Sequence, residues 1–270
     1  MKPQARLVSV TRVESLSPHL RRIVFSSEQL AGFPQGKEGA HVKVLVPHPG
    51  EQFPELAFDA PKPAFKRSYT IRSFDAGSLE LTIDFVVNRH EGPATNWAST
   101  AKVGDFAAIA GPGAPKLSNY NEDNYLLIGD LTSINAVNGF ARYIPRQANL
   151  KSIISVPTSA DMIAMDAGDH LKIEWHIEDE SSQTFEQQVE RVAKVMPSDN
   201  TQVFFGLEAR SVRTIKGILL NDLGYVRTNL FATGYWKKGV DADKFNRQKQ
   251  QSPLKFLLKQ NNTAHWRWFI

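Results

Sequence analysis

The chain has 270 residues, of which 41% are hydrophobic and 22% charged, and this composition is typical of globular proteins with one large domain or two ordinary ones. It contains no cysteine, which excludes disulfides, thiolate zinc sites, cysteine-ligated iron–sulfur clusters and a cysteine nucleophile. Lysine and arginine number 32 against 28 aspartate and glutamate residues, and the surplus of four positive charges favours anionic ligands. Redox chemistry in such a chain would depend on an organic cofactor or on a metal held by nitrogen and oxygen.

The N-terminal part, up to about residue 118, predicts an all-β domain. Short apolar segments alternate with polar residues and are separated by turns rich in proline and glycine, as expected of a barrel or a sandwich. The predicted strands are Arg6–Val13, Leu20–Ser26, His41–Val46, Lys66–Ser73, Ser78–Val87 and Asp105–Gly111.

The pattern changes from Tyr125 onward, where strands alternate with helices and therefore predict a parallel sheet. The predicted strands are Tyr125–Gly129, Lys151–Val156, Leu171–Ile177, Gln202–Gly206 and Asn229–Thr233, and the predicted helices are Ser133–Tyr143, Thr184–Val195 and Ala209–Leu223. The segment Lys116–Asn124 between the two parts is polar and unpatterned. We therefore expect one domain over residues 1–118, a second over 119–240 and a C-terminal extension over 241–270. The extension ends in Trp266, Trp268, Phe269 and Ile270, and we expect this apolar end to dock on its own chain.

Several classes of protein and site find no support in the sequence. No apolar run approaches the roughly 20 residues of a membrane-spanning helix, and no signal core follows the N-terminus, so we expect a soluble cytoplasmic protein without a membrane partner. The seven histidines lack metal-ligand spacing. Basic residues are scattered, so nucleic acid is not an expected partner.

Two segments carry residues suited to a cofactor. In the strand that contains Arg67–Arg72, alternation places Arg67 and Tyr69 on one face, where a guanidinium could pair with phosphate and a phenol could stack on a flat ring. Gly92 and Pro93 begin a short helix over Ala94–Thr100, whose N-terminus could accept a diphosphate. Taken alone, both segments also fit an ordinary strand and an ordinary strand–turn–helix connection.

A third segment, Gly129–Ser133, ends the first strand of the second half, at the edge where open parallel sheets bind ligands. Asp130 or Thr132 could instead cap the following helix. The fingerprint G-x-G-x-x-G of classical dinucleotide binding is absent from the chain.

An antiparallel barrel followed by a parallel α/β half resembles the ferredoxin–NADP⁺ reductase superfamily. Five motifs are similar to those of one branch, the siderophore-interacting proteins, which are FAD-dependent ferric-siderophore reductases. They are Val42-Lys43-Val44 with Pro47, Arg67-Ser68-Tyr69-Thr70, the stretch from Asp84-Phe85-Val86 through His90 and Gly92-Pro93-Ala94-Thr95 to Trp97, Gly129-Asp130 with Thr132-Ser133, and Gly234-Tyr235-Trp236-Lys237-Lys238-Gly239.

The resemblance implies non-covalent FAD in the barrel domain and a nicotinamide nucleotide at the α/β domain. It implies that Arg67 holds the pyrophosphate, that Tyr69 stacks on the isoalloxazine and that Thr70 hydrogen-bonds near its N5. The other cofactor-binding positions that it implies are Ser68, Asp84, Phe85, Val86, His90, Gly92, Pro93, Ala94, Thr95, Trp97 and Thr132.

The implied electron acceptor is an anionic ferric siderophore, a catecholate or a hydroxamate, bound in a basic pocket. Lys43, Lys116, Lys237 and Lys238 are our candidates for this pocket, Lys43 first because its motif matches, and Arg72 is a weaker candidate. Leu131 and Asn135 depart from the family's glutamate and proline near the expected nicotinamide approach. NADH, which we favour, NADPH and reduced ferredoxin are therefore all open as electron donors. The alternatives are another flavin-dependent reductase of the superfamily and a non-enzymatic siderophore carrier.

Overall fold

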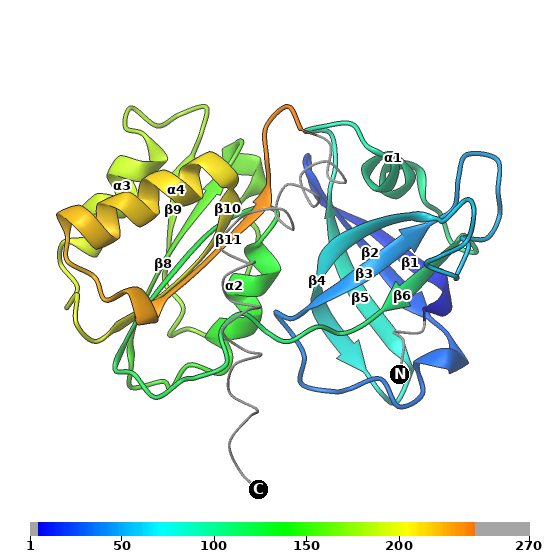
Figure 1. Ribbon diagram of the computed structural model, residues 1–270, viewed down its shortest axis with the longest axis horizontal. Helices are drawn as coiled ribbons and strands as arrows, with labels where there is room; N and C mark the ends of the chain where they lie inside the picture. Colours follow the sequence, from blue (N-terminus) through cyan, green and yellow to red (C-terminus); the bar gives the residue numbers. More distant parts are fainter. Residues whose placement is uncertain (1–4, 241–270) are drawn as a thin grey trace, which may run out of the picture. The chain divides into compact units, whose positions relative to one another are not determined.

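The computed structural model describes residues 5–240 of the chain, which form a β-barrel followed by an α/β half (Figure 1). Within the described residues, internal contacts divide the chain after Tyr235, with residues 5–235 in one compact unit and residues 236–240 in a second. The expected docking of the C-terminal extension concerns residues 241–270 and lies outside the described residues.

Six antiparallel strands close into the barrel, in the order β1-β2-β5-β4-β3-β6. Each of the six overlaps a predicted strand, and β2 and β3 match theirs to the residue, since alternating apolar side chains can bury one face of a strand. They are β1 (Arg6–Ser17), β2 (Leu20–Ser26), β3 (His41–Val46), β4 (Phe65–Asp75), β5 (Glu80–Val86) and β6 (Phe106–Ala110). The helix α1 (Pro93–Thr100) follows β5, and a short 3-10 turn, Glu28–Leu30, follows β2.

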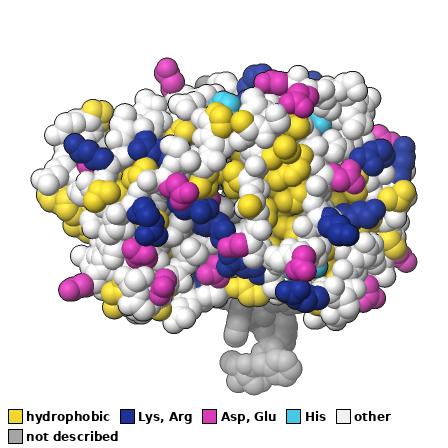
Figure 2. All heavy atoms as spheres, turned by 180° about the vertical axis from the view of Figure 1, so that it is seen from behind, with side chains coloured by type: hydrophobic (Ala, Val, Ile, Leu, Met, Phe, Trp, Pro, Cys, Tyr) yellow, Lys and Arg dark blue, Asp and Glu magenta, His cyan; other side chains and the backbone are white. Residues whose placement is uncertain are grey.

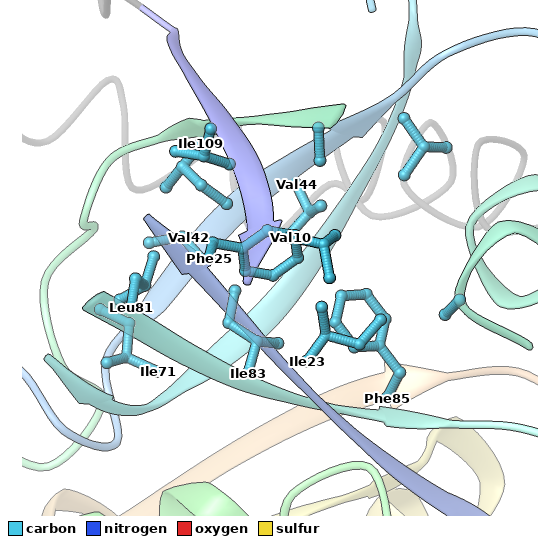
Figure 3. Packing of buried hydrophobic residues seen from close by; sticks show 14 of the residues in the cluster. Val10, Ile23, Phe25, Val42, Val44, Ile71, Leu81, Ile83, Phe85 and Ile109 are labelled. Carbon is cyan, nitrogen blue, oxygen red and sulfur yellow. The ribbon is translucent and has the colours of Figure 1, made fainter. Parts of the chain in front are cut away.

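The barrel interior is filled by aliphatic and aromatic side chains from every strand. Val42 and Val44 of β3 meet Ile71 of β4 and Phe85 of β5 there, and all four are at most 1% exposed (Figure 3). Burying a side chain of this size contributes about 1.5–3 kcal/mol, so the alternation that builds the strands also supplies the barrel's core.

The second half is a five-stranded sheet in the order β11-β10-β7-β8-β9, in which β10, β7, β8 and β9 run parallel. Its elements correspond to the predicted strands and helices. The strands are β7 (Asn124–Asp130), β8 (Asn149–Val156), β9 (Ile173–Ile177), β10 (Thr201–Glu208) and β11 (Leu230–Trp236); the helices are α2 (Ile134–Ala141), α3 (Phe185–Ala193) and α4 (Ala209–Gly217).

Each face of this sheet has its own hydrophobic core. Side chains of α2 share one cluster with β7 and β8, whereas side chains of α3 and α4 share another with β7 and β10. The predicted helix Ala209–Leu223 is not α-helical throughout, because the chain changes after Gly217 to a π-helical turn over Ile218–Asp222. Two short 3-10 turns, Ser159–Asp161 and Arg227–Asn229, complete the described elements.

Helix α2 also lies directly against the barrel. A Cβ atom added to Gly139 would lie 2.4 Å from the backbone nitrogen of Gly39 and 2.5 Å from the carbonyl carbon of Glu38. Two backbones can come this close only where neither carries a side chain at the contact. The same helix contacts β4, the strand that carries the cofactor motif.

Candidate functional site

Strand β4 presents its motif on two faces. Arg67 and Tyr69 lie opposite Val44 and Val42, and the Tyr69 ring packs against the barrel core with its centroid 4.3 Å from that of Phe85. Burial raises the pKa of the Tyr69 phenol, and the nearby Arg67 charge opposes that shift. The tyrosine therefore offers a neutral aromatic ring backed by the core.

Ser68 and Thr70 occupy the opposite, outer face of β4, where they pair with Lys43 and His41 of β3. The Lys43 ammonium donates a hydrogen bond to the Ser68 hydroxyl at 2.5 Å. Thr70 is only 6% exposed, and its hydroxyl is hydrogen-bonded to the phenol of Tyr235 on β11. On the outer face, a cation of β3 is thus bonded to the Ser68 hydroxyl of β4, and the buried Thr70 hydroxyl lies two residues further along the same strand.

The three predicted positions of β5 differ in their surroundings. Phe85 is fully buried in the barrel core, so its side chain supports Tyr69 from within the barrel. Asp84 is buried on the outer face, and its carboxylate accepts hydrogen bonds from Arg22 Nε at 2.8 Å and Arg22 Nη2 at 2.9 Å. The Asn135 amide of α2 donates to the same carboxylate at 3.1 Å. Val86 is half-buried and packs against the cluster that contains α2.

Helix α1 begins at Pro93, and no side chain caps its N-terminus at Gly92. Just before the helix, His90 Nε2 lies 3.0 Å from the Thr95 hydroxyl. Burial, and then the Arg89 charge, lower the pKa of His90, which favours the neutral imidazole. An open hollow of about 360 Å³ lies beside this turn and is lined by Asn88, Arg89, His90, Glu91, Thr95, Asn96 and Ser99.

The remaining positions of this segment are packing residues. Ala94 and Thr95 are buried against the barrel, at 2% and 6% exposure. Trp97 stacks on Phe25, with centroids 6.2 Å apart and an angle of 12° between the ring planes. The Trp97 ring therefore contacts the barrel core through Phe25.

The turn before α2 is held by Asp130. Its carboxylate accepts the backbone N–H of Thr132 at 2.8 Å and the Thr132 hydroxyl at 2.5 Å. The helix begins only at Ile134, with Ser133 at the N-cap position and no side-chain cap. The interpretation of Asp130 or Thr132 as a helix cap was therefore wrong, because these residues close a tight turn one step earlier.

Among the predicted lysines, Lys43 contacts the β4 motif through its hydrogen bond to Ser68. Burial, and then the charges of Lys66 and Arg67, lower the pKa of Lys43. Lys237 and Lys238 follow β11 in a turn and belong to the second compact unit. Arg72, our last candidate, is engaged by Asp166 at 2.7 Å, and Lys116 lies exposed after β6.

Sequence reasoning gave no role in this site to four residues: His41, Arg22, Asn135 and Tyr235. Of these, Asn135 was noted only as a departure from the family's proline and Tyr235 only as part of the closing motif. Alternation could have indicated His41, since it precedes Lys43 by two residues on the same strand. The other three lie far from the β4 and β5 motifs in sequence, and only the register of β2 with β5 and the packing of α2 and β11 bring them in.

The donor set fits a flavin dinucleotide. The Tyr69 ring supplies a flat apolar surface, the Arg67 guanidinium and the uncapped start of α1 supply donors for phosphate, and Gly92 leaves open space where a Cβ would lie. Within residues 5–240, no cluster of three or more histidine, aspartate or glutamate side chains is arranged to hold a metal ion.

The surface carries charges of both signs (Figure 2). On the face shown in Figure 2, lysine and arginine side chains are interspersed with aspartate and glutamate. Every helix of the described part of the chain is too short or too polar to cross a bilayer.

Comparison with known proteins gave consistent matches to both halves. Residues 9–116 match the model of the siderophore-interacting FAD-binding domain, and residues 122–239 match the model of the siderophore-interacting protein. The ferric vibriobactin reductase ViuB of Vibrio cholerae is 27% identical over 254 residues, which cover 90% of this chain and 93% of that protein.

Solved structures agree with these matches. The siderophore-interacting protein SipS of Aeromonas hydrophila is 30% identical with a TM-score of 0.80, and the match covers 92% of this chain and 97% of SipS. A siderophore utilization protein of T. fusca is 29% identical with a TM-score of 0.75, covering 89% of this chain and 95% of that one.

Proposed function

Because the chain belongs to the siderophore-interacting protein family, we propose that it is an FAD-dependent ferric-siderophore reductase that takes its electrons from NAD(P)H. The observation that carries the proposal is the placement of a lysine beside the cofactor motif, on the outer face of β3 and β4. There the Lys43 ammonium contacts Ser68, within the strand that also holds the Tyr69 ring and the Thr70 hydroxyl. A site for a flat cofactor and a site for an anionic substrate would thus adjoin.

The cofactor would be held by residues of the barrel. Arg67 would pair with the pyrophosphate, the start of α1 at Gly92–Thr95 would donate backbone N–H groups to it, and Tyr69 would stack on the isoalloxazine. FAD, when bound, accepts an electron pair from a nicotinamide and delivers single electrons to ferric iron. Residues 1–118 would form this domain, residues 119–240 would admit the nicotinamide nucleotide, and residues 241–270 would be an extension.

The cofactor positions fall into two groups in this proposal. Thr70 and Thr132 would approach the flavin with hydroxyls, while Ser68 would contact it beside Lys43. Asp84, Phe85 and Trp97 act through their neighbours, since the structure engages them with Arg22, Tyr69 and Phe25 respectively.

The substrate would bind where the half-buried Lys43 lies beside β4. Its charge would attract an anionic ferric siderophore, a catecholate or a hydroxamate, and Lys237 and Lys238 are further candidates for the same role. Hard oxygen ligands hold Fe³⁺ more tightly than Fe²⁺, so reduction would loosen the chelate and release the iron. We favour NADH over NADPH or reduced ferredoxin as the donor, and the cytoplasm, where nicotinamides are available, as the location.

The absorbance spectrum tests this function directly. Purified protein should be yellow, its flavin bands should bleach on anaerobic addition of NADH, and a ferric siderophore should restore them while a ferrous-iron indicator develops colour. A protein that binds a ferric siderophore but no FAD would be a carrier. A protein that reduces free flavin faster than any ferric chelate would be a flavin reductase of the same fold.

A further inference from the structure

His41 is the first residue of β3 and shares the outer face of that strand with Lys43, two residues on. Its partner across the sheet is Thr70, and the partner of Lys43 is Ser68. The histidine is therefore next to the cation proposed to hold the substrate and opposite the threonine proposed to approach the flavin. Nothing in the proposed reduction assigns it a role.

The imidazole of His41 is held by the backbone of Gly113, which follows β6. A Cβ at Gly113 would lie 2.3 Å from the ring's Cε1 and 2.5 Å from its Nε2, so the ring occupies the space that any other residue's side chain would fill. The Gly113 backbone N–H also donates to the His41 carbonyl at 2.8 Å. Glycine at this position therefore leaves room for the His41 ring beside the segment that follows β6.

The charged groups that act on His41 come from two elements. Lys43 lies on its own strand, Lys116 lies on the segment after β6, and β4 presents the uncharged Thr70 opposite. Burial, then Lys116, then Lys43 lower the pKa of His41, so the imidazole is neutral at neutral pH. An anion bound beside Lys43 would offset both lysine charges and favour the protonated ring.

We propose that His41 takes up a proton when an anionic ferric siderophore binds and returns it to a siderophore oxygen once the iron is reduced. The inference rests on the proposed function. In this step Fe³⁺ gains one electron from reduced FAD, an iron–oxygen bond breaks with its electron pair left on oxygen, and that oxygen receives the proton from the imidazolium. His41 is then neutral again and can be protonated from solvent when the next chelate binds.

Calorimetric titration of the oxidised holoenzyme tests the uptake without turnover. A trianionic ferric tris-catecholate is titrated at about pH 6 to 8 in buffers of different ionisation enthalpy, which report the protons taken up on binding. Wild type should take up about one proton in part of this range. His41→Gln should take up none. His48→Gln is the matched control and should behave as wild type, since His48 hydrogen-bonds the carbonyl of Pro63 on another loop.

A further variant and a kinetic measurement extend the test. Lys43→Gln removes one charge that lowers the pKa of His41, so the pH range of proton uptake should move upward. In a single turnover at about pH 6 to 7, Fe²⁺ release to a chelator should slow at least about tenfold in His41→Gln, because a general acid contributes on the order of 10²-fold or more. FAD content should not change.

Two results would overturn the inference and leave the reductase function standing. One is that His41→Gln takes up as many protons as wild type, and the other is that wild type binds the chelate without taking up any proton. The wild-type measurement decides even if the variant fails to fold. Failure of every ferric chelate to bind would overturn the proposed function and this inference together.

Discussion

Asp84 shows how a single side chain of the site depends on distant parts of the chain. Its carboxylate is fully buried, and its partners Arg22 and Asn135 are 62 and 51 residues away in sequence. A buried charge is stable only when it is paired and hydrogen-bonded. The hydrogen bond to Asp84 also raises the pKa of Arg22, outweighing the opposing effect of its burial.

Replacing Asp84 should therefore destabilise the fold. Asp84→Ala leaves the partly buried Arg22 and the buried Asn135 without their acceptor, and we expect the free energy of unfolding to fall by about 3 kcal/mol. Arg191→Ala is the control, because its pair with Glu174 is largely exposed and should cost less than about 1 kcal/mol. Urea unfolding followed by tryptophan fluorescence measures both. If both variants lost the same free energy of unfolding, the ion pair of Asp84 would contribute no more to stability than an exposed pair.

Lys43 should distinguish substrates by their charge. Lys43→Ala is expected to raise KM about tenfold for a trianionic ferric catecholate, which corresponds to about 1.4 kcal/mol, and less than about twofold for a neutral ferric hydroxamate. Lys62→Ala is the control, since Lys62 is exposed and paired with Glu51 at 2.6 Å. Steady-state kinetics with both chelates provide the measurement. Similar increases in KM for both chelates would remove the proposed role of Lys43.

Helix α2 packs against two parts of the protein, the parallel sheet and the barrel. Its apolar residues fill the cluster shared with β7 and β8, and its Gly139 lies on the backbone of Glu38 and Gly39 in the barrel. Asn135, one turn earlier, reaches Asp84 from the same helix. Glycine lowers helix propensity, so propensity does not account for Gly139 in this helix. The close contact with the barrel backbone does.

Substituting this glycine should reveal the contact. Gly139→Ala improves helix propensity, yet its Cβ would meet backbone atoms at 2.4 and 2.5 Å, so we expect a loss of about 2 kcal/mol in stability. Gly217→Ala at the end of α4 is the matched control. It meets nothing within 4 Å and should stabilise the protein by up to about 1 kcal/mol. Both values come from urea unfolding at saturating FAD. A stabilised Gly139→Ala variant would mean that α2 does not press on the barrel.

The barrel and the α/β half are joined by two carboxylates. Asp161, fully buried, accepts hydrogen bonds from Ser17 at 2.7 Å and from the His19 backbone N–H at 3.1 Å, and its second oxygen lies 2.8 Å from His19 Nδ1. Asp166 binds Arg72 of β4 at 2.7 Å and Arg142, at the end of α2, at 2.6 Å. Because both carboxylates lie between β8 and β9 and have partners in the barrel, they hold the two halves in one arrangement.

Asp166 makes this arrangement sensitive to acid. Burial would raise its pKa, but hydrogen bonds from Arg142, Arg72 and Asn138 outweigh burial and hold the pKa well below its usual range. A carboxyl with a depressed pKa stabilises the fold above about pH 4, and that contribution is lost as the pH falls toward the folded-state value. Asp166→Asn should thus be less stable than wild type at pH 7, and the difference should shrink below about pH 4.

Urea unfolding at several pH values measures this difference, with Asp222→Asn, an exposed residue of the π-helical turn, as the control. The control should match wild type at every pH. A difference for Asp166→Asn that stays constant with pH would contradict a stabilising ionised carboxylate.

Much of the fold could be read from local pattern. The predicted strands Leu20–Ser26 and His41–Val46 coincide with β2 and β3 to the residue, because alternation along a strand directly reflects which side chains enter the core. The helical prediction over Ala209–Leu223 was less accurate, since periodicity near 3.6 does not separate an α-helix from the π-helical turn that follows Gly217. The motif around Arg67–Thr70 was recognised by resemblance, whereas Arg22 gave no local signal.

The succession of strands and helices along the chain and the family resemblance follow from the sequence, since each depends on residues close together in the chain. The tertiary structure decided which residues come into contact. Arg22 and Asn135 donate hydrogen bonds to Asp84, the His41 ring lies beside Gly113, and Gly139 lies against Gly39. These contacts depend on sheet register and on the packing of α2, which are set by the summed burial of many side chains and by no single stretch of sequence.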